Sequence, residues 1–154
     1  MISNITINDF TQTPDDYSGV YGLFLKEDAN LDIFIPAIKE QIKISAKDNN
    51  NLIYIGESQT VMRRIYANHL QGIGASTLRE TLWEIFAKND FVTQNISGNK
   101  TTIINKWLKE NTYFKTYTVN EHCQAEKFLI SKYNPILNDG RRKFKIEIEK
   151  YLFS

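Results

Sequence analysis

The stretch NLIYIGESQTVMRRIYANH, residues 51–69, decides the fold because it predicts a buried strand that runs directly into a helix. Its first part, LIYIG at 52–56, is a short run rich in β-branched and aromatic residues, which is typical of a buried strand. From Ser58 onward the apolar residues recur at helical spacing. A tyrosine, a glycine and the adjacent pair Arg63 and Arg64 therefore lie within one strand-to-helix connection.

Outward from this stretch, the apolar run GVYGLFL at 19–25 predicts a second strand, which we expect to pair with 52–56. The segment between them, about 26–51, is interpreted as an insertion that forms a hairpin or a short helix, with a loop at 45–51. Near the end of the chain, apolar Phe and Ile residues alternate with charged ones, which predicts a strand at about 142–152 with one exposed face. The other expected elements are helices at 77–88, 101–110 and 121–133 and a strand at 113–119.

These elements predict one α/β (α+β) domain over residues 1–154, with its core at about 17–140. We expect a small, mainly antiparallel three-stranded central sheet flanked by helices, plus the insertion and the C-terminal strand. The length of 154 residues is enough to bury a substantial core. Neither a signal peptide nor a membrane span is expected, so we predict a cytoplasmic protein with no membrane partner. A lone Cys123 and two histidines form no recognisable zinc spacing, and no structural metal is expected.

Charge is distributed unevenly along the chain, although the net charge is only +1. Residues 1–60 hold four Lys and nine Asp or Glu, whereas residues 61–154 hold fifteen Lys or Arg and nine Asp or Glu. A basic C-terminal part suits a phosphate backbone, because non-specific affinity for nucleic acid comes mainly from such charges. An ordinary solvated surface with uneven charge is the alternative.

Two triplets, GVY at 19–21 and YIG at 54–56, resemble the paired signature triplets of the GIY-YIG nuclease family. Three further residues strengthen the resemblance. Arg64 lies ten residues after the first tyrosine of YIG, where the family places its helix arginine. Glu126 precedes Asn138 by twelve residues, a spacing similar to that of the family's metal-binding glutamate and C-terminal asparagine. The segment that ends at this asparagine, YNPILN, also resembles the family's Pro-x-x-Asn ending.

The chain departs from the family pattern near the helix arginine. Glu57 is acidic where the family is often basic or small. The family's histidine is usually four residues beyond the arginine, but here Asn68 takes that position and His69 follows it. Five residues on a regular helix turn a side chain about 140° from Arg64, so His69 faces the same site only if the helix is distorted or ends there.

The resemblance implies hydrolysis of a DNA phosphodiester with one divalent cation, Mg²⁺ or Mn²⁺. Glu126 would then bind the metal, and Tyr54 would bind phosphate or metal-held water. Tyr21 would orient or deprotonate the attacking water, which requires that the site lower its pKa, with the help of Arg64, or that a neighbour take the proton. Arg64 would clamp the scissile phosphate with its planar fork. Packing in the strand core is the alternative for both tyrosines, and a solvent-facing carboxylate is the alternative for the glutamate.

Two further residues have expected roles in the site. His69 would act as a helper base or a phosphate ligand, with a partly buried, hydrogen-bonded histidine as the alternative. Asn138 would hold the turn or the metal-binding glutamate in position, or would simply cap a loop after a proline. The cations expected to contact DNA beyond the site, any one of which could be only a solvated charge, are Arg63, Arg79, Arg141, Arg142 and Lys143.

A metal-dependent DNA endonuclease is the function that the resemblance favours. The alternative is a nucleic-acid-binding module of the same fold that is catalytically weak or inactive, with Glu57 repelling phosphate. One active site cuts one strand at a time, so a homodimer formed through the terminal strand would be a natural route to double-strand cleavage.

Overall fold

The protein is described by a computed structural model that covers residues 2–5, 16–88 and 99–153. Its described part contains one antiparallel sheet with strands β1 (Ile2–Ile5), β2 (Gly19–Leu25), β3 (Leu52–Ser58) and β4 (Thr112–Thr118). The strand order is β1-β4-β2-β3. The three expected strands are confirmed, and β1 adds a fourth strand at the β4 edge that the sequence analysis did not predict.

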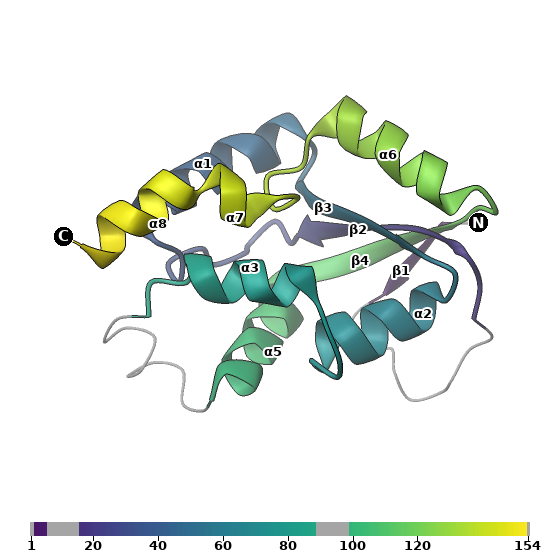
Figure 1. Cartoon of the computed structure of the whole chain (residues 1–154), viewed down its shortest axis with the longest axis horizontal. Helices are drawn as coiled ribbons and strands as arrows, with labels where there is room; N and C mark the ends of the chain where they lie inside the picture. The colour runs from purple at the N-terminus through teal and green to yellow at the C-terminus, as the bar shows by residue number, and fades with distance from the viewer. Residues whose placement is uncertain (1, 6–15, 89–98, 154) are drawn as a thin grey trace.

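Helices cover both faces of this sheet (Figure 1). Helix α6 (His122–Tyr133) lies over one face, and α3 (Thr77–Ile85) and α5 (Lys100–Asn111) lie on the other. The helix expected after β3 consists of a short α2 (Val61–Arg63) that continues as a π-helix, η2 (Arg64–Leu70). The expected helices at 77–88, 101–110 and 121–133 are confirmed with small shifts of their ends.

The main core lies between the sheet and the α3–α5 layer. Along β2, Leu23 and Leu25 are buried on this face, together with Phe114 from β4. The opposing helices contribute Ile65, Leu82 and other fully buried side chains. Alternate strand residues point to opposite faces of a sheet, so the remaining strand residues face α6. That helix contains no buried residue, and the face beneath α6 is therefore packed less completely.

The insertion between β2 and β3 forms a helix, α1 (Pro36–Asp48), and not a hairpin. Proline stands at its first position, where no intrahelical N–H bond is lost. Ile38, Ile42 and Ala46 are buried at intervals of four residues, so one face of the helix joins the core. The helix also includes residues 45–48, which had been predicted as part of a loop.

The predicted C-terminal strand at about 142–152 is wrong, because this segment forms α7 (Gly140–Lys143) and α8 (Lys145–Leu152). The alternating pattern also fits a helix, since Phe144, Ile148 and Tyr151 recur at spacings of four and three. Phe144 is fully buried, and the other two pack against the core, whereas Ile146 is 64% exposed. The terminal segment therefore offers no strand for dimerisation. Among the described residues, no helix has the length and apolar character needed to cross a bilayer.

Candidate active site

The two triplets that begin β2 and run through β3 lie side by side, with Tyr21 directly opposite Gly56. The Tyr21 ring covers this glycine so closely that a Cβ at position 56 would overlap the ring and its hydroxyl. Gly19 is equally confined, because a Cβ there would overlap the backbone carbonyl of Tyr117 on β4. Both glycines are thus explained by close approach and not by an unusual backbone angle.

Tyr21 is 3% exposed, and its hydroxyl lies 2.7 Å from Nε2 of His69, which is fully buried. The other ring nitrogen of His69, Nδ1, lies 2.7 Å from the hydroxyl of Ser76. Ser76 is the N-cap residue of α3, and its hydroxyl also accepts a bond from the Arg79 backbone N–H. A continuous chain of hydrogen bonds therefore runs from the first signature triplet to the start of α3.

The π-helix explains how His69 reaches this position. In η2 the backbone bonds run from residue i to i+5, so residues five apart lie on nearly the same side of the helix. Arg64 and His69 are separated by five residues, and both act on Tyr21: the arginine through its charge, the histidine through Nε2. The helix distortion that the sequence required for His69 to face the site is present.

The hydrogen bonds of Tyr21 determine the proton positions that we assign. The positive charge of Arg64 lies near the Tyr21 hydroxyl, so we assign the Tyr21 proton to the side away from it, where it donates to Nε2 of His69. Nδ1 of His69 then carries the ring proton and donates to Ser76. Burial, reinforced by the nearby positive charges of Arg64 and Arg79, lowers the pKa of His69 to about 3, so the imidazole is neutral near pH 7.

Burial dominates the electrostatics of both site tyrosines. It raises the pKa of the Tyr21 hydroxyl well above its ordinary value, and the neighbouring Tyr54 adds to the rise. Arg64 opposes this shift, as expected from the sequence, but its effect is smaller than that of burial. Burial likewise raises the pKa of Tyr54, against the charge of Arg64. Arg64 thus acts on the pKa of Tyr21 in the expected direction, but burial outweighs it and Tyr21 remains a neutral phenol, which leaves the expected alternative that a neighbour takes the proton.

Glu126 approaches the tyrosines from α6 on the far side of the site. Its negative charge contributes to the raised pKa of both Tyr21 and Tyr54, so the carboxylate lies within electrostatic reach of both hydroxyls. Burial raises the pKa of Glu126 itself, and the like charge of Glu57 raises it further. No hydrogen bond or ion pair to another described residue occupies the Glu126 carboxylate. The structure thus brings Tyr21, Tyr54, Arg64 and Glu126 together from β2, β3, η2 and α6.

Asn138 connects the end of the α6 segment to β3. Its side-chain oxygen accepts a bond from the backbone N–H of Ile55, and its side-chain nitrogen donates to the Ile55 carbonyl, both at 2.8 Å. The neighbouring Leu137 N–H donates to the Ile53 carbonyl at 2.9 Å. Asn138 therefore holds the middle residue of the YIG triplet, a more direct constraint on the site than a loop cap.

A divalent cation fits the donor set around Glu126. The carboxylate is half-buried, which raises its pKa, and the like charge of Glu57 raises it further, by more than either the nearby Lys127 or His122 lowers it. Carboxylate oxygens are the protein ligands that Mg²⁺ and Mn²⁺ prefer, and Mg²⁺ commonly uses only one or two of them. A bound cation would relieve the repulsion between the Glu126 and Glu57 carboxylates.

Arg79 does not act as a surface cation, contrary to the DNA-contact prediction. It is 6% exposed, and its guanidinium donates to the carbonyls of His69 and Thr101 and to the side chain of Asn105. These bonds tie the C-terminal end of η2 to α5. Because its guanidinium is buried and hydrogen-bonded, Arg79 supports the backbone of His69 from inside the fold.

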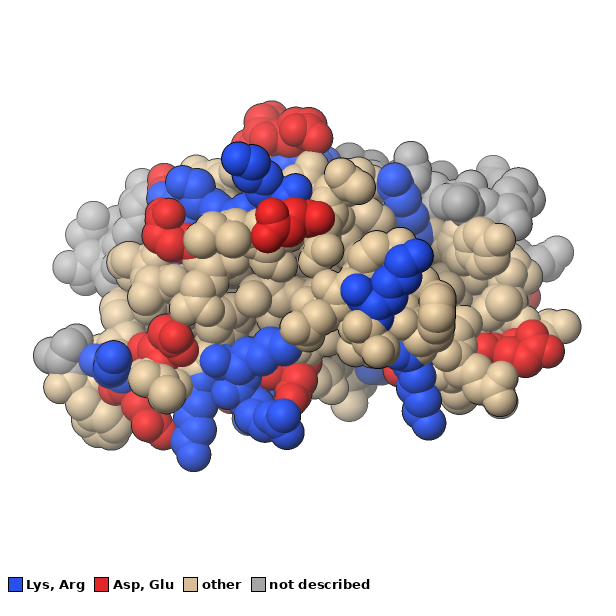
Figure 2. Space-filling view, turned by 90° about the horizontal axis from the view of Figure 1, so that it is seen from above, with Lys and Arg blue, Asp and Glu red and all other residues tan. Residues whose placement is uncertain are grey.

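The other predicted DNA contacts are exposed. Arg63 lies at the end of α2, and the remaining three lie on α7. Arg141 pairs with Glu84 at 2.8 Å, Arg142 pairs with Asp139 at 3.2 Å, and Lys143 donates to Asn134 and Pro135. In Figure 2, basic and acidic side chains are intermingled on the face seen from above. The α7 cations thus remain accessible, but acidic partners offset part of their charge.

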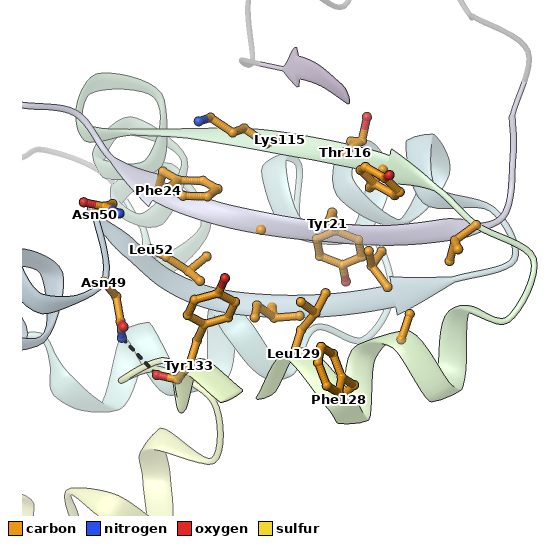
Figure 3. Close-up of a pocket in the computed structure, with 16 residues that line it drawn as sticks. Tyr21, Phe24, Asn49, Asn50, Leu52, Lys115, Thr116, Phe128, Leu129 and Tyr133 are labelled. Carbon is orange, nitrogen blue, oxygen red and sulfur yellow. Dashed lines mark hydrogen bonds between the residues drawn. The ribbon is translucent and has the colours of Figure 1, made fainter. Parts of the chain in front are cut away.

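An apolar pocket of about 640 Å³ lies between α6 and the sheet (Figure 3). Leu129 and Tyr133 project into it from α6, and Phe24 and Leu52 line it from the strands. Tyr21 contributes to its wall, whereas Arg64, His69 and Glu126 are not among the described residues that line it. The pocket is therefore a separate feature that results from the incomplete packing of α6, and the polar site does not occupy it.

Sequence reasoning missed Ser76 and the supporting role of Arg79. A serine just before a helical pattern is a recognisable N-cap, so Ser76 could have been identified as a helix start. Nothing in the sequence indicates that its hydroxyl also meets His69. The sequence also gave no indication that Glu57 would lie beside His122 and Cys123, because residue 57 is 65 positions from the histidine.

Comparison with known protein families matches residues 19–154 to the GIY-YIG catalytic domain. The matched region begins at the first glycine of β2 and includes all the side chains of the candidate site described above. No curated protein and no solved structure gives a significant match to the chain.

Proposed function

The chain belongs to the GIY-YIG catalytic domain family, and on that premise we propose that it is a metal-dependent endonuclease that hydrolyses phosphodiester bonds in DNA. Family membership supports nuclease activity in general, and hence a nucleic acid substrate. The choice of DNA, the reliance on Mg²⁺ or Mn²⁺ and the residue roles below are the parts that we propose. We also propose that the enzyme acts in the cytoplasm.

Tyr21 is the residue that we assign to the attacking water. Its oxygen lies near the positive charge of Arg64 and has a lone pair with which to accept from a water molecule. As the water attacks phosphorus, its proton passes to the Tyr21 oxygen and the Tyr21 proton passes to Nε2 of His69. This route needs no free phenolate, which the raised pKa of Tyr21 would make scarce.

The low pKa of His69 makes the histidine a weak base in the free protein. A bound phosphate would change this, because its negative charge beside Arg64 would offset one of the two positive charges that lower the pKa of His69. The Ser76 hydroxyl would then stabilise the imidazolium by accepting a bond from Nδ1. Substrate binding would thereby raise the basicity of the group that receives the proton.

Arg64 would hold the scissile phosphate through the donors of its guanidinium that Asn68 and Ala75 leave free. Tyr54 would donate to a phosphate oxygen from the neighbouring strand. Glu126 would bind a divalent cation, which when present supplies positive charge to stabilise the negative charge that develops on the phosphoryl oxygens. The bond from phosphorus to the leaving oxygen breaks, and that oxygen takes up a proton from solvent.

One observation carries the proposal: the Tyr21 hydroxyl meets His69 and lies within electrostatic reach of Arg64 and Glu126. Groups that serve one reacting phosphate must converge on it, and these four residues come from three separate elements of the chain, β2, η2 and α6. Ordinary core packing accounts for the buried tyrosine ring but not for an unpaired carboxylate beside it.

Nicking of supercoiled plasmid by the purified chain tests the proposal. We expect cleavage that requires Mg²⁺ or Mn²⁺, is lost in Glu126→Ala and persists in Gln124→Ala, an exposed neighbour on the same helix. DNA binding measured in Ca²⁺ should be similar in all three proteins. If the wild-type chain binds DNA but does not cleave it with any metal across varied substrates, the endonuclease proposal fails and the binding-module alternative is supported.

A further inference from the structure

A cluster of potential metal ligands lies beside the candidate active site, where β3 ends and α6 begins. Glu57 is on β3, and His122 and Cys123 are the first two residues of α6. One ligand atom from each lies within 4.8 Å of the other two. Glu57 and His122 are 65 positions apart in the sequence, so only the fold brings their side chains together.

The spacing of these atoms suits a tetrahedral ion. Zinc bonds of about 2.0 to 2.3 Å, arranged tetrahedrally, place neighbouring ligand atoms about 3.5 Å apart. The Cys123 sulfur lies 3.7 Å from the Glu57 carboxylate oxygen and 3.6 Å from Nδ1 of His122. Nδ1 of His122 and the Glu57 carboxylate are in direct hydrogen-bond contact, and an ion would replace the proton between them. The two distances from the Cys123 sulfur are therefore already near the ligand spacing that a tetrahedral zinc ion requires.

The chemistry of the three groups distinguishes this cluster from the site at Glu126. A thiolate and an imidazole are ligands for borderline or soft ions such as Zn²⁺, whereas Mg²⁺ prefers oxygen alone. Cys123 is exposed, so an ion can reach the cluster from solvent. We propose that Glu57, His122 and Cys123 form a binding site for Zn²⁺ or a similar transition-metal ion, distinct from the Mg²⁺ or Mn²⁺ position at Glu126 and completed by a water molecule.

An ion bound here would join the end of β3 to the first turn of α6. That helix has no buried residue and lies over the apolar pocket, so side-chain packing fixes it only weakly to the sheet. A ligand that binds only the folded state stabilises it by mass action. We expect zinc at about 100 times its dissociation constant to raise the melting temperature by about 5 to 10 °C.

Titration with Co²⁺ under reducing conditions tests this site without DNA. One equivalent of Co²⁺ should produce the sulfur-to-cobalt charge-transfer absorption and the visible bands of a tetrahedral thiolate complex. Added Zn²⁺ should displace the bound Co²⁺ and remove this absorption. Cys123→Ser should remove the charge-transfer band and the thermal shift while leaving the circular dichroism spectrum unchanged. His122→Ala should weaken binding at least tenfold. Gln124→Ala, an exposed residue in the same turn, should bind like the wild-type protein.

The Glu126→Gln variant separates this site from the proposed nuclease site. Co²⁺ absorption that persists in this variant supports a separate site, and this result does not depend on whether the protein cleaves DNA. The proposal is overturned if the wild-type protein binds neither Co²⁺ nor Zn²⁺, if Cys123→Ser retains the charge-transfer band, or if Glu126→Gln abolishes it.

Discussion

The β-strand side of the candidate site is closed and hydrogen-bonded, whereas the α6 side is half-exposed and carries like charges. On the strand side, Tyr21, His69 and Ser76 are buried and linked by short hydrogen bonds. On the α6 side, Glu126 has no partner among the described residues and faces Glu57. Neutral groups that handle a proton can be fully satisfied in the free protein, but carboxylates that bind a cation remain unsatisfied until it arrives.

The largest effect should come from removing the hydroxyl on the closed side. Tyr21→Phe should lower the plasmid nicking rate about 10² to 10⁴-fold at saturating metal, because the water loses its route to His69. Glu126→Gln should instead raise the metal concentration needed for half-maximal cleavage. Tyr117→Phe, an exposed tyrosine on the neighbouring β4, is the control. If added metal restores the nicking rate of the Tyr21→Phe variant, the two sides do not have the separate roles that we propose.

Alanine substitutions at two glycines compare the two faces of the sheet. Gly56→Ala should lower the free energy of unfolding by about 3 kcal/mol, because its Cβ would overlap the buried Tyr21 ring, which the His69 bond holds in place. Gly22→Ala should cost less, because its Cβ meets only the side-chain ends of Phe24 and Leu52 beside the pocket. Urea denaturation measures both values. Equal losses would show that the two faces are packed equally tightly.

Asn138 offers a smaller test on the α6 side. Asn138→Ala should lower the free energy of unfolding by about 2 kcal/mol, because the buried Ile55 loses the partners of its N–H and its carbonyl. Asn120→Ala, in an exposed turn before α6, should change stability by less than about 0.5 kcal/mol. A loss at Asn138 no larger than at Asn120 would mean that water replaces the asparagine at no cost.

The most gradual effect is the pH dependence that His69 imposes on stability, because it is spread over several pH units. Its pKa is lowered from 6.5 to about 3 in the folded protein, so the unfolded chain binds more protons between these values. The free energy of unfolding should therefore fall as the pH drops through this range, by up to about 1.4 kcal/mol per pH unit. His69→Gln should flatten this slope in urea titrations at several pH values. Parallel slopes for the two proteins would contradict the buried neutral histidine.

Prediction from the sequence succeeded where a local pattern had only one interpretation. The apolar runs at 19–25 and 52–56 became the paired strands β2 and β3, and the expected pairing is confirmed. It failed at residues 142–152, because Phe144 and Ile148 satisfy both a period of two and a period near 3.6. The contact that buries Phe144 in the core is long-range, and local sequence carries no information about it.

Local sequence was also insufficient to place the side chains of the candidate site. The sequence indicated that His69 required a distorted helix, but only the structure contains the π-helix. Arg79 looked like any other cation in the sequence, and its burial follows from the convergence of η2, α3 and α5. Positions that depend on a single strand or helix were predictable, and contacts that join three elements were not.

By itself, the sequence determined the family, the three central strands and the residue types of the candidate site, because short motifs and apolar periodicity are local properties of a chain. The tertiary structure alone decided that the C-terminal segment is helical, that Tyr21 bonds to His69, and that Glu57 meets His122 and Cys123. The physical reason is that burial and hydrogen bonding between distant segments depend on how the helices pack against the sheet. These contacts exist only once the whole domain has folded.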